Sequence, residues 1–264
     1  MSETEFVLSA RQFEFVWTDL GLGRIPYPLD VPSSGKTMAE RVELKAEAYR
    51  ELAERGLVTD GTVSPELTSL LRLLSQPRLS VDAVGHIGRP LRALAATDQE
   101  LGVLATLAGD ELRIGEIRPT SLARSIVGVL PAKEAGPGWA MSAPLHALTA
   151  AVESDEDDDP WGSDDDDEER ALRKAGMSAE DAAALAELAA NRKGGGQFGV
   201  TVGGATQRQA RRSATLVTWF DTHQGRYLMV REDEWLSLAP ADGERIEGRV
   251  MEVLSRAAGT PTGR

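Results

Sequence analysis

The chain has 264 residues, no cysteine and a formal net charge of −13. A chain of this length buries a substantial core, in one large domain or two small ones. The lack of cysteine excludes disulfides, thiolate metal sites and cysteine nucleophiles. No apolar run reaches the ~18–20 residues of a membrane span, and residues 1–6 hold no basic residue of a signal peptide. We therefore expect a cytoplasmic protein without membrane insertion.

Helix signals dominate the first 75 residues. Ser9 and Gln12 form a capping box that opens a short amphipathic helix, and glycines at 21 and 23 end it. Residues 25–31 contain two prolines and predict an extended or edge segment.

Two further helices follow this segment. Thr37 and Glu40 form a second capping box, and the helix that they open runs to about Arg55, with Gly56 as its C-cap. The pattern predicts its buried stripe as Met38, Val42, Tyr49 and Leu52. A third helix extends from Pro65 to Leu74.

Four strand-like runs come next and lead into a helix. The strands are predicted at Leu79–Val84, Leu91–Ala96, Leu101–Leu107 and Leu112–Ile117. Pro119 then opens the helix.

The negative charge is concentrated in one segment. Residues 153–169 contain 12 acidic residues and no basic one, and the rest of the chain holds 30 acidic against 29 basic residues. Such a block repels itself and predicts a disordered loop. Part of it is spaced like a calcium-binding loop, but Trp161 stands where an oxygen ligand belongs. We predict no metal site and no cofactor.

The second half repeats the order of the first. Ser178 caps a helix whose apolar face includes Leu185 and Leu188, and the glycines at 194–196 are interpreted as a linker at its end. Strands are predicted at residues 198–202, 211–220, 226–231 and 234–238. A final amphipathic helix carries Ile246, Val250, Val253, Leu254 and Ala257 on one face.

A helix, meander, helix order that occurs twice predicts two related halves that share one sheet. We divide the chain into an N-terminal half at 1–152, the acidic loop at 153–169, a C-terminal half at 170–258 and a flexible tail at 259–264, all in one globular domain.

No catalytic motif accompanies this scaffold. The sequence has no G-x-S-x-G, H-E-x-x-H or P-loop string, and its three histidines share no metal-binding spacing. The string at 194–199 matches G-x-G-x-x-G but precedes a predicted strand, the reverse of the arrangement that cradles phosphates. The nearly neutral body argues against nucleic-acid binding. We predict a binding protein without catalytic residues. The alternatives are a hydrolase-type enzyme with a loop-borne site and a self-assembling structural protein.

Residues 213–222, SATLVTWFDT, followed by GRYL at 225–228, resemble the EspG family of type VII (ESX) secretion chaperones in actinobacteria. The start of the chain agrees in Phe13, Trp17, the PYPL string at 26–29 and the RGL string at 55–57. The closing pattern at 242–254 agrees as well. The resemblance covers about residues 6 to 256 and rests on the order of many structural positions.

This resemblance implies an α+β fold with a central antiparallel sheet, flanking helical bundles and quasi-twofold related halves. It implies a cytosolic chaperone that binds the apolar tip of a PPE-like helical protein in a PE–PPE heterodimer. Such a chaperone keeps the cargo soluble and directs it to the secretion machinery, with no cofactor and no covalent chemistry. By position, the expected partner-binding residues are Leu185, Leu188, Arg211, Arg212, Thr215, Trp219, Arg226, Leu228, Val250 and Leu254.

Overall fold

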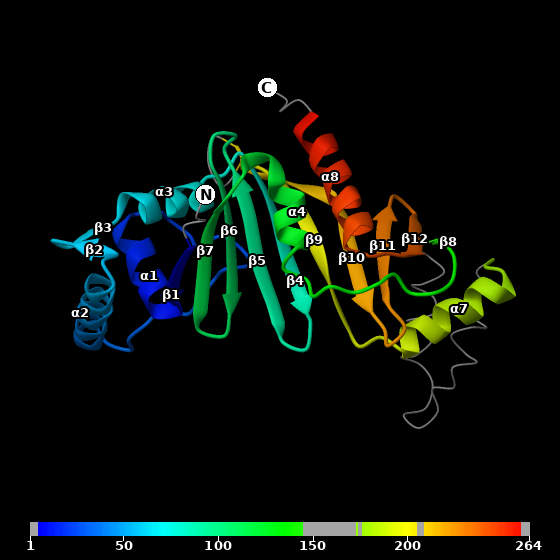
Figure 1. The fold of residues 1–264 in the computed structure, drawn as a ribbon, viewed down its shortest axis with the longest axis horizontal. Coiled ribbons are helices and arrows are strands. Elements are labelled where there is room, and N and C mark those ends of the chain that lie inside the picture. The colour runs from blue at the N-terminus through cyan, green and yellow to red at the C-terminus, as the bar shows by residue number, and fades with distance from the viewer. Residues whose placement is uncertain (1–4, 145–172, 174–175, 205–208, 260–264) are drawn as a thin grey trace.

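A single ten-stranded antiparallel sheet runs through the molecule, with helices on both of its faces (Figure 1). The computed structural model describes residues 5–144, 173, 176–204 and 209–259. The strands of the sheet are β1 (Glu5–Ser9), β4 (Leu79–His86), β5 (Pro90–Thr97), β6 (Gly102–Ala108), β7 (Glu111–Ile117), β8 (Met141–Pro144), β9 (Gly194–Val202), β10 (Arg211–Asp221), β11 (Arg226–Glu232) and β12 (Trp235–Pro240).

The helices lie at the two ends of the sheet and across one of its faces (Figure 1). They are α1 (Ala10–Asp19), α2 (Met38–Glu54), α3 (Pro65–Ser75), the 3₁₀ turn η1 (Pro119–Ser121), α4 (Leu122–Val127), α7 (Ala179–Ala190) and α8 (Gly243–Gly259). A separate small hairpin is formed by β2 (Val58–Thr59) and β3 (Thr62–Val63). Within the described ranges, no helix is both long and apolar enough to cross a bilayer.

The strand order is symmetric about the pair β4–β9. Outward from this pair run β5, β6, β7 and β1 on one side, and β10, β11, β12 and β8 on the other. Helix α4 follows β7, and α8 follows β12. This arrangement confirms the predicted α+β fold with an antiparallel sheet shared by two related halves. The division into numbered segments stays a prediction, since the acidic loop 153–169 and most of the tail lie outside the described residues.

Strand alternation sends apolar side chains to both faces of the sheet. On the first face, β5, β6 and β7 pack against α1 and α3 in a core that includes Phe13, Trp17, Leu71, Leu94 and Ile114. On the same face of the other half, Phe220, Tyr227 and Leu238 pack against α7. The second face is sealed by α4 and α8, which contact each other and β4, β5, β9 and β10.

Several predicted elements formed as expected. Ser9 and Gln12 make the reciprocal capping box, with Gln12 N donating to Ser9 Oγ at 3.1 Å and Ser9 N to Gln12 Oε1 at 3.0 Å. The second box is only half formed: Glu40 N donates to Thr37 Oγ1 at 3.2 Å, but the Glu40 carboxylate accepts from Lys36 N instead. The short strands β1, β2, β3 and β8 were not predicted.

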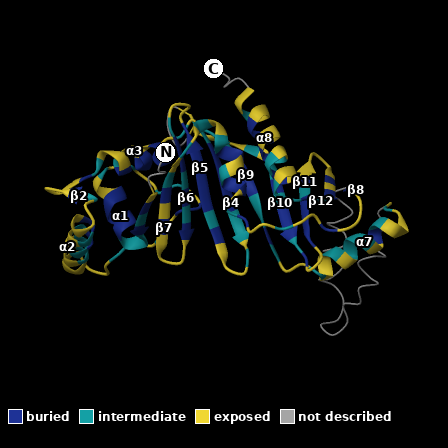
Figure 2. Cartoon of the chain, in the orientation of Figure 1, coloured by how far each residue is buried: buried dark blue, intermediate teal, exposed yellow. Residues whose placement is uncertain are grey.

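The predicted buried stripe of α2 is wrong in its first half. Met38 and Val42 are exposed, whereas Leu52 is fully buried and Tyr49 packs against the edge of the core. Helix α2 packs mainly on α1 and the β2–β3 hairpin, so its first turns extend beyond the core and much of its surface is exposed (Figure 2).

The interpretation of residues 194–196 as a linker is also wrong, because these glycines are the first residues of the central strand β9. A Cβ at Gly196 would lie 2.3 Å from the Val84 carbonyl oxygen, and one at Gly85 would lie 2.3 Å from that of Gly195. Gly85 and Gly196 are register partners. The two halves therefore meet at positions where only glycine fits. From composition alone, a run of glycines is typical of a loop, so this strand was missed.

We expect Gly196→Ala to lower the free energy of unfolding by roughly 1–3 kcal/mol, because the new methyl group meets backbone rather than a movable side chain. Urea denaturation measures this. Gly115→Ala in β7 is the matched control, since nothing lies within 4 Å of its Cβ position. Equal stability of the two variants would contradict the close packing of β4 on β9.

Candidate partner-binding surface

The middle of the first face carries no helix in the described part of the chain. It lies between the α1–α3 end and the α7 end, and is formed by β4, β9 and β10 (Figure 1). We call it the open strip. Half-exposed side chains occupy it, namely Val84, Gln197, Thr201, Leu216 and Thr218. A sheet face in which polar and apolar groups alternate without a covering layer can bind another protein.

An ion pair lies across the open strip. Arg212 on β10 forms two hydrogen bonds with the Asp82 carboxylate on β4, one of them between Nη2 and Oδ2 at 2.9 Å. The Asp82 side chain is 5% exposed and that of Arg212 39%. The hydrogen bond to Asp82 raises the pKa of Arg212 above its ordinary value, so the guanidinium stays charged.

Gly199 makes this ion pair possible. It lies on β9, opposite Asp82 in the register, and a Cβ there would lie 1.9 Å from Arg212 Nη2. The guanidinium thus rests on bare backbone where any other residue would displace it. Gly199 was not predicted to have a role, because the sequence around a strand glycine does not show which side chain from another strand lies over it.

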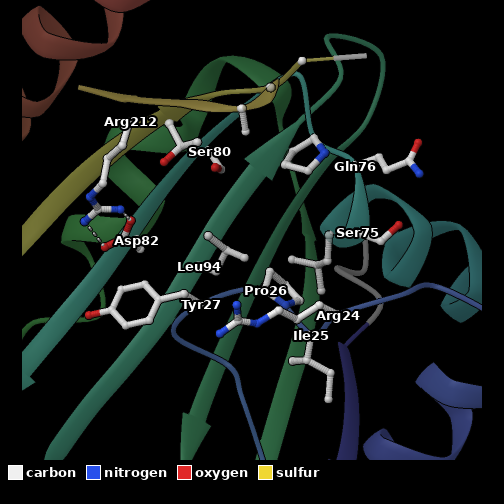
Figure 3. A pocket seen from close by; sticks show the side chains of 16 residues that line it. Arg24, Ile25, Pro26, Tyr27, Ser75, Gln76, Ser80, Asp82, Leu94 and Arg212 are labelled. Atoms are coloured by element: carbon white, nitrogen blue, oxygen red, sulfur yellow. Dashed lines mark hydrogen bonds and ion pairs between the residues drawn. The ribbon is translucent and has the colours of Figure 1, made fainter. Parts of the chain in front are cut away.

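A groove runs from this ion pair toward the α3 end (Figure 3). It has a volume of about 310 Å³. Its lining combines apolar groups from the segment before α2, from α3 and from β5 with the polar groups of the open strip, and includes Ile25, Pro26, Tyr27, Leu74, Leu94, Ser80, Asp82, Thr201 and Arg212. The Tyr27 ring is half-exposed and lies 5.9 Å from the Arg212 guanidinium carbon.

The other end of the open strip is bordered by α7. Leu185 and Leu188 are half-buried against the cluster of Phe220, Tyr227 and Leu238. The half-exposed Trp139 donates from Nε1 to Asp181 Oδ1 at 3.0 Å, close to the start of α7. The two predicted leucines thus lie beside the open strip and point partly into the sheet.

Five predicted residues belong to the core. Trp219, Leu228, Val250 and Leu254 are buried between the sheet and α8, on the sealed face. Arg226 is 1% exposed and also lies on that face, with its guanidinium 5.2 Å from the Trp219 ring. We exclude these five from the candidate surface, because all of them are buried.

Arg226 has a structural partner rather than a free charge. Its Nε donates to Asp221 Oδ1 at 2.7 Å and its Nη2 to Oδ2 at 3.1 Å. Its backbone holds the segment before β8, since Arg226 N donates to the Glu134 carbonyl and Gly136 N donates to the Arg226 carbonyl. Arg226 therefore fixes the β10–β11 turn.

The two remaining predicted residues lie at the start of β10. The register of β10 against β9 shifts between Arg212 and Leu216, and Thr215 lies half-buried in this bulge. Arg211 is exposed, and by alternation it points to the face opposite Arg212. Of the predicted set, Arg212 lies on the open strip and Leu185 and Leu188 lie beside it, whereas sequence reasoning missed Tyr27, Asp82 and Trp139.

The histidines give no catalytic grouping among the described residues. His86 and His223 are exposed near strand ends, and His146 lies outside the described residues. Within the same ranges no three His, Asp or Glu residues are arranged to hold a metal ion.

Comparisons with known proteins identify the family and the fold of this chain. The model of the EspG family matches residues 9–252. This chain belongs to the EspG family. A solved structure with the same fold is the Mycobacterium tuberculosis type VII secretion system chaperone EspG5 in complex with the PE25–PPE41 dimer. The match covers 99% of this chain and 98% of that chain, at 16% identity and a TM-score of 0.76. No curated protein matches. At this identity the likeness to EspG5 shows the fold of this EspG member.

We expect Asp221→Ala to destabilise this EspG protein by about 3–5 kcal/mol, because it leaves the buried Arg226 cation without a partner. Chemical denaturation measures the loss. Asp30→Ala is the control. The Asp30 carboxylate also pairs with an arginine, Arg92, but at 3.6 Å and on the exposed surface, so its removal should leave stability nearly unchanged. If Asp221→Ala were as stable as the control, Arg226 would not be a structural residue.

Proposed function

We propose that this EspG protein is a cytoplasmic chaperone of type VII secretion. It binds the apolar tip of a PPE-like helical protein in a PE–PPE heterodimer, keeps that cargo soluble and directs it to the secretion machinery. It acts by binding alone, without a cofactor or a chemical step. The observation that carries the proposal is a sheet face that no described helix covers, bordered by helices at both ends, in a chain of this family.

The physical requirements of such a chaperone match the open strip. A cargo with an exposed apolar tip associates with other molecules unless the tip is covered. A surface that binds such a tip reversibly needs apolar contacts at its centre and a polar, solvent-accessible rim. The open strip offers Leu216 and Val84 beside Gln197 and Thr218, with Tyr27 and Trp139 as exposed aromatic residues near its two ends. Aromatic residues of this kind carry much of the binding energy in protein interfaces.

The fold match supports the same assignment. EspG5 was solved in complex with the PE25–PPE41 dimer, and the two chains correspond over nearly their whole lengths. A shared architecture is the basis on which we transfer this kind of partner to the present chain.

The direct experiment is co-expression with PE–PPE pairs encoded in the same genome, followed by size-exclusion chromatography with light scattering. We expect a complex with one copy of each of the three chains for at least one pair. A chaperone that elutes alone with every pair would contradict the proposed function, and a large homo-oligomer would favour the self-assembly alternative instead.

The open strip is tested by Thr218→Arg, which places a long charged side chain in the middle of β10. We expect it to weaken the complex at least tenfold by calorimetry and to leave the unfolding temperature within a few degrees. Thr106→Arg on β6 is the matched control, because Thr106 is equally half-exposed but lies on the opposite face of the sheet. If Thr106→Arg weakened binding and Thr218→Arg did not, the cargo would bind the other face.

A further inference from the structure

The Arg212–Asp82 pair presents hydrogen-bond donors without net charge. A guanidinium has five N–H donors, and Asp82 accepts from two of them. The other three make no hydrogen bond within the described residues, on a side chain that is 39% exposed. Because the Asp82 carboxylate already balances the Arg212 cation, neutral acceptors of a partner can satisfy these donors without adding a charge to the pair.

The groove beside these donors is lined by apolar groups together with polar ones such as Arg24, Ser75 and Gln76. Ile25, Leu74 and Leu94 line it, and Tyr27 borders it next to Arg212 (Figure 3). A side chain of the size of leucine or phenylalanine fits in about 310 Å³. The position therefore combines a socket for an apolar side chain with a donor group a short distance away.

We propose that this socket receives the C-terminal end of a helix of the cargo, with an apolar side chain of its last turn in the groove and its free main-chain carbonyls on Arg212. The last four carbonyls of a helix have no partner within the helix, so a helix end offers neutral acceptors next to apolar side chains. A cargo carboxylate fits less well, since it would be a third charge beside a pair that is already neutral. This inference rests on the proposed function and names the part of the cargo that the open strip recognises.

The experiment compares Arg212→Lys with the wild-type protein, using the PE–PPE pair that forms the complex in the co-expression test. Lysine keeps the charge and the contact with Asp82 but lacks the planar fork of donors. We expect the dissociation constant to rise about tenfold. Arg211→Lys is the matched control, because this neighbour points to the opposite face, and its dissociation constant should equal that of the wild type.

Salt dependence separates a carbonyl from a carboxylate. Both proteins are measured at about 50 and about 500 mM NaCl, where screening differs strongly. For carbonyl acceptors, the ratio of the Arg212→Lys and wild-type dissociation constants should be the same at both salt concentrations. A cargo carboxylate would attract lysine as well as arginine. In that case Arg212→Lys would bind nearly as well as the wild type at low salt, and the helix-end assignment would be overturned.

A second variant covers the case that Arg212→Lys is unstable. The double variant Asp82→Asn with Arg212→Gln removes both charges, so no buried carboxylate is left without a partner, and it should lose affinity by at least the same factor. Wild-type affinity in every variant that folds would overturn this inference and leave the proposed function standing. Absence of any complex with the wild-type protein would instead overturn the proposed function and this inference with it.

Discussion

The pairing of β4 with β9 is the constraint on which the rest of the structure depends. It joins the two meanders into one sheet, and it runs over eight register pairs from Leu79↔Val202 to His86↔Gly195. Glycines at 85, 194 and 196 bring the two backbones together where side chains would collide. A sheet joined in this way is continuous, so a surface can extend across the boundary between the halves.

The distribution of helices gives the two faces of this sheet different roles. On one face α4 and α8 contact each other across the β4–β9 pair and bury Trp219 and the apolar stripe of α8. On the other face the helices lie at the two ends, and the strands near the boundary stay uncovered in the described part of the chain. Each face has its own core, but only the open strip, which no described helix covers, carries side chains such as Gln197 and Asp82 that a closed core would not accept.

The sequence predicted the parts of the fold that are fixed by local chemistry. Capping residues such as Ser9 and Ser178 set helix starts, and alternating apolar residues set the strands of both meanders. Features that depend on distant packing were not predicted. The glycines at 194–196 read as a linker because nothing in their neighbourhood reveals β4 beside them, and Met38 read as buried because helical spacing does not show where the core ends.

The candidate site was predicted less well than the fold, for a related reason. Residue types that are common in interfaces are also common in cores, and Trp219 and Arg226 proved to be a buried pair. Only the register decides between the two faces of a strand, and the register comes from pairing partners far away in the chain. Asp82 and Tyr27 gain their significance only from Arg212, which is 130 residues from Asp82 along the chain.

The bulge in β10 has a consequence for how this surface can change. Between Arg212 and Leu216 the strand advances four residues while β9 advances two, from Thr201 to Gly199. The surplus is an even number, so side chains before and after the bulge keep the same alternation between faces. Loss or gain of one residue there would exchange Arg211 and Arg212, placing the wrong arginine over Gly199 while leaving the rest of β10 in place. A change of two residues in this bulge would keep both arginines on their present faces, whereas a change of one residue would reverse them.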